Sequence, residues 1–96
     1  MDVLVTYDID TTTPAGVRRL LRVARVCESY GQRVQDSVFE CRLSPAALQR
    51  LMVELRSRID VGTDSANLYR FEGSLAAARI SLGRRVEHEL GRPWIL

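Results

Sequence analysis

The chain has 96 residues, of which 46% are hydrophobic, which is enough for one small globular domain over residues 1–96. No apolar run approaches the roughly 20 residues that span a bilayer, and the N-terminus lacks the basic and apolar regions of a signal peptide. We therefore expect a cytoplasmic protein without a membrane segment. The net charge is only +2, yet all 14 basic residues are arginines. Arginine binds phosphate with paired hydrogen bonds, but a GC-rich coding sequence also enriches arginine.

The first predicted element is a strand over residues 3–10, where β-branched and aromatic residues are frequent. Side chains alternate between the two faces of a strand. One face is apolar and is expected against the core: Val3, Val5, Tyr7 and Ile9. The other face becomes acidic toward its end: Leu4, Thr6, Asp8 and Asp10. Such an aspartate either forms the turn after the strand or serves metal or phosphate chemistry. Asp10, past the apolar stretch, is the better turn former.

Thr13 and Pro14 predict the N-cap and first residue of a helix that extends to about Tyr30. Apolar residues at helical spacing predict its buried face. They are Val17, Leu20, Leu21, Ala24 and Cys27. Gly31 is expected to end the helix in a left-handed conformation. The two cysteines, Cys27 and Cys41, fit no metal-ligand or disulfide spacing and are expected to be buried.

The same helix carries four arginines before its first acidic residue, Glu28: Arg18, Arg19, Arg22 and Arg25. Three of them, at positions 18, 22 and 25, share one helix face. A solvated helix face usually mixes charges of both signs. This face therefore indicates contact with a polyanion such as nucleic acid, with an ordinary solvated surface as the alternative.

Residues 33–43 have the composition of a strand, but their apolar alternation changes parity within the stretch. A bulge or a tight reversal near Asp36-Ser37 would resolve the conflict, so the stretch is either one irregular strand or two strands. Ser44 and Pro45 repeat the cap-and-proline signature and predict a second helix that ends near Arg58. Its apolar stripe consists of Leu48, Leu51, Met52, Leu55 and Ile59.

The last third of the chain is less regular. Residues 66–72 predict a further strand, and residues 74–83 fit either a short helix capped by Ser74 or a loop that leads into a strand. Residues 85–90 alternate charged with less polar side chains, which predicts a late, half-exposed strand. The apolar end at 94–96 is expected to dock on the protein itself or on a partner.

The predicted order of elements is that of an α+β, ferredoxin-like βαββαβ sandwich with an additional C-terminal strand. Both helices then cover one face of an antiparallel sheet and leave the other face open. Leu4, Thr6 and Asp8 belong to that open face. A second protomer packed there about a two-fold axis would bring two copies of Asp8 near each other.

Few kinds of catalytic site fit this sequence. Its one histidine, His88, lies far from any motif, and there is neither a glycine-rich phosphate loop nor zinc-ligand spacing. Oxygen-ligand chemistry remains, because Mg²⁺ takes one or two carboxylates and keeps several waters. Two copies of Asp8 with arginines nearby would suit a metal-dependent phosphodiesterase, although one aspartate alone is not a motif.

Several stretches carry a family resemblance. They are the strand at residues 5–9, the pair Arg18-Arg19, the run GQRVQDSVFEC from Gly31 to Cys41, the helix start at Leu43-Ser44-Pro45 and the start of a strand at Asp64-Ser65. Together they resemble the CRISPR-associated protein two family, the small dimeric partner of the CRISPR adaptation integrase. The resemblance covers roughly the whole chain, and the run from Gly31 to Cys41 is its most specific part.

This resemblance implies a ferredoxin-like homodimer formed through the open sheet faces, with the late strand added to the partner's sheet. It implies a metal-dependent endonuclease that acts on single-stranded RNA or double-stranded DNA, with Asp8 as the metal ligand. Positions of the family's active region match Tyr7, Arg18, Arg19, Arg33 and Phe39. Of these, we expect Tyr7, Arg33 and Phe39 to be catalytic together with Asp8. It also implies a role in spacer acquisition, in which the dimer bridges two integrase dimers and holds the DNA to be inserted.

Three alternatives stay open from the sequence. A non-catalytic adaptor would neutralise phosphates with the arginines of the first helix without reading sequence, and would dock on the integrase through residues 94–96. A toxin-like ribonuclease of the related virulence-associated group would share the fold. A small-molecule-binding regulatory domain of the same fold would show no salt-dependent affinity for DNA.

Overall fold

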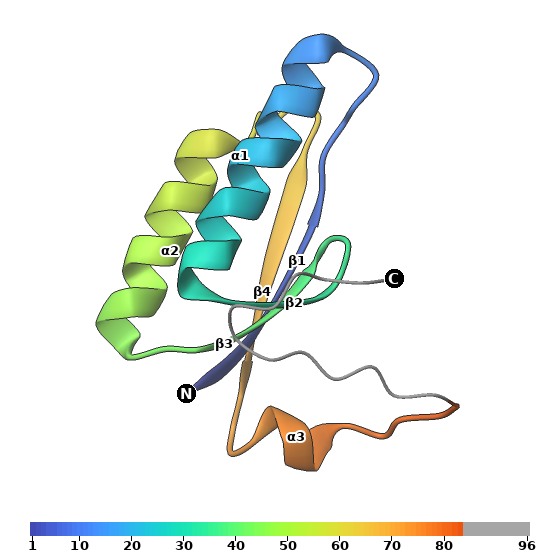
Figure 1. Ribbon diagram of the computed structural model, residues 1–96. Helices are drawn as coiled ribbons and strands as arrows, with labels where there is room; N and C mark the ends of the chain where they lie inside the picture. Colours follow the sequence, from blue (N-terminus) through green and yellow to red (C-terminus); the bar gives the residue numbers. More distant parts are fainter. Residues whose placement is uncertain (84–96) are drawn as a thin grey trace.

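The computed structural model describes residues 1–83. Its elements are β1 (Asp2–Asp8), α1 (Pro14–Tyr30), β2 (Gly31–Gln35), β3 (Val38–Arg42), α2 (Pro45–Arg58), β4 (Ser65–Phe71) and α3 (Leu75–Ala78). The strands form one antiparallel sheet in the order β2-β3-β1-β4, and α1 and α2 lie side by side over one face of it (Figure 1). This confirms the predicted ferredoxin-like α+β fold. The predicted late strand at residues 85–90, His88 and the apolar end at 94–96 lie outside the described residues.

The core lies between the sheet and the two long helices. The apolar face of β1 is buried as predicted, with Val3, Val5, Tyr7 and Ile9 each at most 7% exposed. On β3, Phe39 and Cys41 stand in register with Val5 and Val3 and share the buried side. Burying one side chain of this size contributes about 1.5–3 kcal/mol to stability. Since β1 is one of the two central strands and pairs with both β3 and β4, its alternation shows which face of the sheet is packed and which is open.

Both long helices begin as predicted. The Thr13 hydroxyl accepts a hydrogen bond from the Gly16 N–H at 3.1 Å, and the Ser44 hydroxyl accepts one from the Ala47 N–H at 3.1 Å. Each cap is followed by a proline at the first helical position, where a missing N–H costs nothing. These local signals are strong enough to define the starts of α1 and α2.

The predicted buried face of α1 is wrong in part. Val17 and Leu21 are 45% and 55% exposed. The buried residues of α1 are Gly16, Val23, Ala24 and Cys27. A Cβ atom at Gly16 would collide with the Asp10 carbonyl. The helix therefore approaches the end of β1 through its glycine, and this close approach rotates Val17 and Leu21 toward solvent.

Gly31 also differs from its prediction. Its φ of −164° and ψ of −160° are extended, and the residue begins β2 directly after α1. A Cβ atom at Gly31 would collide with the Cys41 thiol and the Glu40 carbonyl, so glycine is needed for the close approach of β2 to β3. The stretch 33–43 is two strands, with a turn at Asp36-Ser37 and a register shift within β2. This turn and shift explain the change in apolar parity.

The apolar stripe of α2 is confirmed at Leu48, Leu51 and Leu55, which are buried. Met52 departs from the prediction, because it is 38% exposed, and Ile59 is only partly buried against the core. None of the helices within residues 1–83 combines the length and the apolar character that crossing a bilayer requires.

The segment after β4 resolves one of the open alternatives. It forms the short helix α3, whose cap Ser74 accepts a hydrogen bond from the Ala77 N–H at 3.2 Å. The Asp2 carboxylate accepts a hydrogen bond from the Leu75 N–H at 2.8 Å, and Arg79 forms an ion pair with Glu40. These two contacts tie α3 and the residue after it to the N-terminal end of β1 and to β3, at the opposite end of β1 from Asp8.

Candidate functional site

Asp8 is the last residue of β1, and its side chain is exposed on the sheet face that α1 and α2 do not cover, here named the open face. Its register partner on β4 is Ser65. Among residues 1–83 the Asp8 carboxylate takes part in none of the four ion pairs, which use other acids. Asp8 is thus an exposed carboxylate at the end of β1, as predicted, and its oxygens are available to a ligand.

The open face changes character along β1. Toward Asp8 it is polar, with Thr6 in register with Asn67. Toward the middle of β1 it is more apolar, with half-buried Leu4 in register with Tyr69, which is 51% exposed. Leu4 and Tyr69 therefore form a small apolar patch beside the polar end of this face. Both the carboxylate and the apolar patch therefore belong to the same face of the sheet.

Tyr7, Phe39 and Arg33 lie on the other side of the sheet, toward the helices. The Tyr7 and Phe39 rings stack with their centroids 6.2 Å apart, and the Arg33 guanidinium lies 5.2 Å from the centroid of Phe39. Arg33 also pairs with Glu28 of α1 at 3.3 Å. The Tyr7 hydroxyl donates to the Asp36 carbonyl at 3.2 Å, and burial raises the pKa of Tyr7 to about 12. This phenol therefore stays protonated near neutral pH.

The four residues predicted as catalytic are consequently divided between two faces. Asp8 is exposed on the open face, whereas Tyr7 and Phe39 are in the core and Arg33 packs over Phe39. Neighbouring residues of a strand point in opposite directions, so Tyr7 and Asp8 of one chain do not face the same space. The structure gives the three core-side residues a supporting position behind the strand end that carries Asp8.

Arg19 forms hydrogen bonds with the buried carboxylate of Asp64. Its Nε atom donates to Asp64 Oδ2 at 2.8 Å and its Nη2 atom to Oδ1 at 3.3 Å. Asp64 also accepts the backbone N–H groups of Asp10 and Asp60, at 2.9 and 2.8 Å. The Arg19 hydrogen bond, followed by these N–H groups, holds the pKa of Asp64 well below its usual range despite burial. Arg19, which was predicted to contact nucleic acid, thus joins α1 to the loop before β4 through its guanidinium, while its side chain stays 20% exposed.

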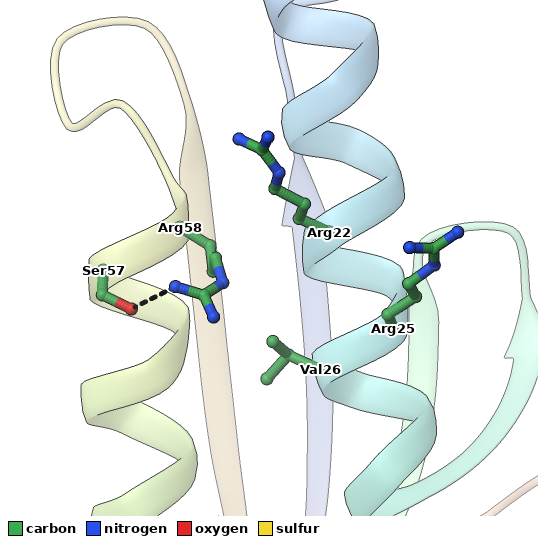
Figure 2. A pocket seen from close by; sticks show the side chains of 5 residues that line it. All are labelled: Arg22, Arg25, Val26, Ser57 and Arg58. Carbon is green, nitrogen blue, oxygen red and sulfur yellow. Dashed lines mark hydrogen bonds between the residues drawn. The ribbon is translucent and has the colours of Figure 1, made fainter.

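The other three arginines predicted for nucleic acid, Arg18, Arg22 and Arg25, are exposed on α1. None of them forms an ion pair within the described part of the chain. Arg22 and Arg25 line a hollow of about 380 Å³ between α1 and α2, together with Val26, Ser57 and Arg58. Figure 2 shows Arg22 and Arg58 projecting toward the gap from the two helices. Sequence reasoning missed Arg58, because only the packing of α2 against α1 places it beside Arg22.

The described residues contain no group of three or more histidine, cysteine or acidic side chains that could hold a metal ion. The Asp10 carboxylate is already used, because it accepts hydrogen bonds from the Thr12 N–H at 2.9 Å and hydroxyl at 2.7 Å, which confirms its predicted turn. One chain thus offers Asp8 as an available carboxylate at this end of the sheet. This donor set fits Mg²⁺ completed by water and phosphate oxygens, and it does not fit a zinc centre.

The two cysteines are buried free thiols, as predicted. Burial raises the pKa of Cys27 to about 12 and that of Cys41 to about 11. Because the thiolate is the reactive form of cysteine, neither residue is suited to nucleophilic chemistry.

Comparisons with known proteins agree with this arrangement. The family described as CRISPR associated protein Cas2 matches residues 1–76. The CRISPR-associated endoribonuclease Cas2 of Chlorobaculum tepidum is 51% identical over 89 residues, which cover 93% of this chain and 85% of the relative. The CRISPR-associated endonuclease Cas2 of Halalkalibacterium halodurans is 41% identical over 95 residues, which cover 99% of both chains.

The fold of this chain is also similar to that of a solved structure. The crystal structure of Streptococcus pyogenes Cas2 is similar with a TM-score of 0.78 and 47% sequence identity, over 86% of this chain and all of that one. Fold, sequence and the strand that carries Asp8 lead to the same conclusion: this chain belongs to the CRISPR-associated Cas2 family.

Proposed function

We propose that this chain is a Mg²⁺-dependent endonuclease that hydrolyses phosphodiester bonds in RNA or duplex DNA, with Asp8 as its metal-binding residue. The observation that carries the proposal is the exposed Asp8 carboxylate at the end of β1, with no ion-pair partner among residues 1–83. Relatives named as an endoribonuclease and as an endonuclease support the reaction class.

The proposed active form is a homodimer. A second copy packed against the open face would cover Leu4 and Tyr69 and, about a two-fold axis, would place two Asp8 carboxylates in one site. This arrangement would supply the second carboxylate that one chain lacks.

The chain's own residues have distinct tasks in this proposal. Asp8 would hold the ion and orient it toward the scissile phosphate. When bound, Mg²⁺ would lower the pKa of a bound water and offset charge on the phosphate. Tyr7, Phe39 and Arg33 would act as positioning residues, because they fix the end of β1 against the β2–β3 turn through stacking and the Tyr7–Asp36 hydrogen bond.

A second function, which does not require cleavage, is that of an adaptor in spacer acquisition. We propose that the dimer bridges CRISPR integrase dimers and holds DNA through arginines of α1. The observation that favours it is the set Arg18, Arg22 and Arg25, exposed and without acidic partners in residues 1–83. Deleting residues 92–96 should abolish co-purification with the integrase. Family membership argues against the toxin-like alternative.

The nuclease proposal is tested by cleavage of single-stranded RNA and of duplex DNA with Mg²⁺ by the wild type and by Asp8→Asn. The amide keeps the shape of the side chain and removes its charge, so the rate should fall by about 100-fold or more. Asp36→Asn is the matched control, because the Asp36 side chain is exposed in the turn and only its carbonyl bonds to Tyr7. Equal cleavage rates for Asp8→Asn and the wild type would contradict the proposal that Asp8 is the metal-binding residue.

A further inference from the structure

We propose that the hollow between α1 and α2 is a second nucleic-acid contact, in which Arg22 and Arg58 bind a backbone phosphate on the side of the molecule opposite Asp8. The inference rests on the proposed function only in taking nucleic acid as the ligand. It requires neither Mg²⁺ nor cleavage.

The hollow is assembled from two helices that run in opposite directions (Figure 1). Arg22 and Arg25 lie one turn apart on α1, and Arg58 is the last residue of α2. Val26 lies between the helices in Figure 2 and forms the apolar part of the lining. Arg58 Nη1 also donates to the Ser57 hydroxyl of the same helix at 3.5 Å. Arginines from separate helices therefore meet around a space of about 380 Å³.

The residues that line the hollow include no acidic side chain. The four ion pairs within residues 1–83 use Arg19, Arg33, Arg42 and Arg79 and none of the three arginines of the hollow. Like charges around one space repel each other, and an anion between them removes that repulsion. Guanidinium groups bind phosphate oxygens with two parallel hydrogen bonds. Phosphate is thus the chemical group that matches both the charge and the donors of this hollow.

The position of Arg58 has its own physical basis. It lies in the last turn of α2, where the carbonyl end of the helix carries partial negative charge and favours a cation. This interaction helps α2 to hold Arg58 beside the arginines of α1 in the absence of a carboxylate partner. Arg56 lies in the same turn but does not line the hollow, which makes it a matched control.

The hollow and Asp8 lie on opposite sides of the sheet, because α1 and α2 cover the face away from Asp8 (Figure 1). One phosphate cannot contact both sites of one chain. A phosphate in the hollow is therefore held apart from Asp8 of the same chain, and binding there should survive loss of the carboxylate. Arginine–phosphate contacts carry no base information, so the contact should be independent of sequence.

The test is a salt titration of labelled duplex DNA binding by the full chain. The slope of log K against log salt should fall in magnitude by about 0.9 for each phosphate that the protein no longer neutralises. Arg58→Gln and Arg22→Gln should each lower the slope, whereas Arg56→Gln should leave it unchanged and Arg58→Lys should retain most of it. All these side chains are exposed, and thermal unfolding of each variant verifies that its fold is intact.

Several outcomes would overturn the inference. One is an unchanged slope for Arg58→Gln, whatever the slope of Arg22→Gln, and another is an equal decrease in Arg56→Gln. A third is stabilisation by inorganic phosphate that Arg58→Gln abolishes while the DNA slope stays the same, which would assign the hollow to free phosphate.

The nuclease proposal and the phosphate contact at the hollow are tested independently of each other. Asp8→Asn should bind DNA with the wild-type slope, since the hollow lies on the other side of the sheet. Loss of cleavage in Asp8→Asn together with an unchanged slope in Arg58→Gln and Arg22→Gln would reject the hollow and keep the nuclease. Wild-type cleavage by Asp8→Asn together with a reduced slope in Arg58→Gln would reject the nuclease proposal and keep the phosphate contact at the hollow.

Discussion

Arg19 and Asp64 form an ion pair of 2.8 Å that joins α1 to the loop before β4, and the Asp64 side chain is completely buried. The same carboxylate accepts two backbone N–H groups, one of them from Asp10 just after β1. Three segments that are distant in sequence therefore meet at one carboxylate, close to the strand end that carries Asp8.

Asp64→Asn should destabilise the protein by about 3 kcal/mol, because removing one partner leaves the other charge without compensation. Urea unfolding at a fixed protein concentration measures the change. Arg18→Gln, a neighbouring exposed arginine, is the control and should stay within about 0.5 kcal/mol of the wild type. Similar midpoints for Asp64→Asn and the wild type would show that the pair contributes little.

The same pair predicts how stability depends on acid. The pKa of Asp64 is lower in the folded protein than its usual value, chiefly because of the Arg19 hydrogen bond. Its contribution is therefore fully present above the unfolded pKa of about 4 and is lost as the pH falls below that value. Between neutral pH and pH 3, the free energy of unfolding should decline less steeply in Asp64→Asn than in the wild type. Parallel curves for the two proteins would contradict the assignment.

Tyr7→Phe tests whether the Tyr7 hydroxyl only stabilises the fold or also takes part in phosphodiester cleavage. The substitution removes the hydrogen bond from the Tyr7 hydroxyl to the Asp36 carbonyl and keeps the ring stacked on Phe39. We therefore expect the free energy of unfolding to fall by about 1 kcal/mol. Mg²⁺-dependent cleavage should remain within a few-fold of the wild type, because the hydroxyl faces away from the open face. A loss of cleavage as large as that of Asp8→Asn, with stability retained, would instead place the phenol at the reacting phosphate.

Gly31→Ala tests the close approach of β2 and β3. The added methyl group would collide with the Cys41 thiol and the Glu40 carbonyl, and we expect a destabilisation of about 3 kcal/mol. Gly62→Ala is the matched control, since its Cβ would meet only the Asp60 carboxylate at 3.3 Å. Equal thermal midpoints for Gly31→Ala and Gly62→Ala would mean that β2 shifts without cost.

Local patterns predicted most of the fold. The alternation along β1 identified its buried and open faces, and the Thr13 and Ser44 caps located the starts of both helices, because caps and strand faces depend on neighbouring residues. The rotation of α1 was missed, because it results from the contact of Gly16 with the Asp10 carbonyl. Spacing alone cannot reveal how closely a helix approaches a strand.

For the candidate site, the sequence by itself determined that Asp8 ends an apolar strand on its less buried face and that α1 is rich in arginine. Only the tertiary structure decided what each arginine does. Arg19 pairs with Asp64, 45 residues away, and its guanidinium is engaged by that buried carboxylate. Arg22 meets Arg58 of α2 at a hollow. The physical reason is that charge pairing depends on which helices and loops pack together, and that packing is long-range.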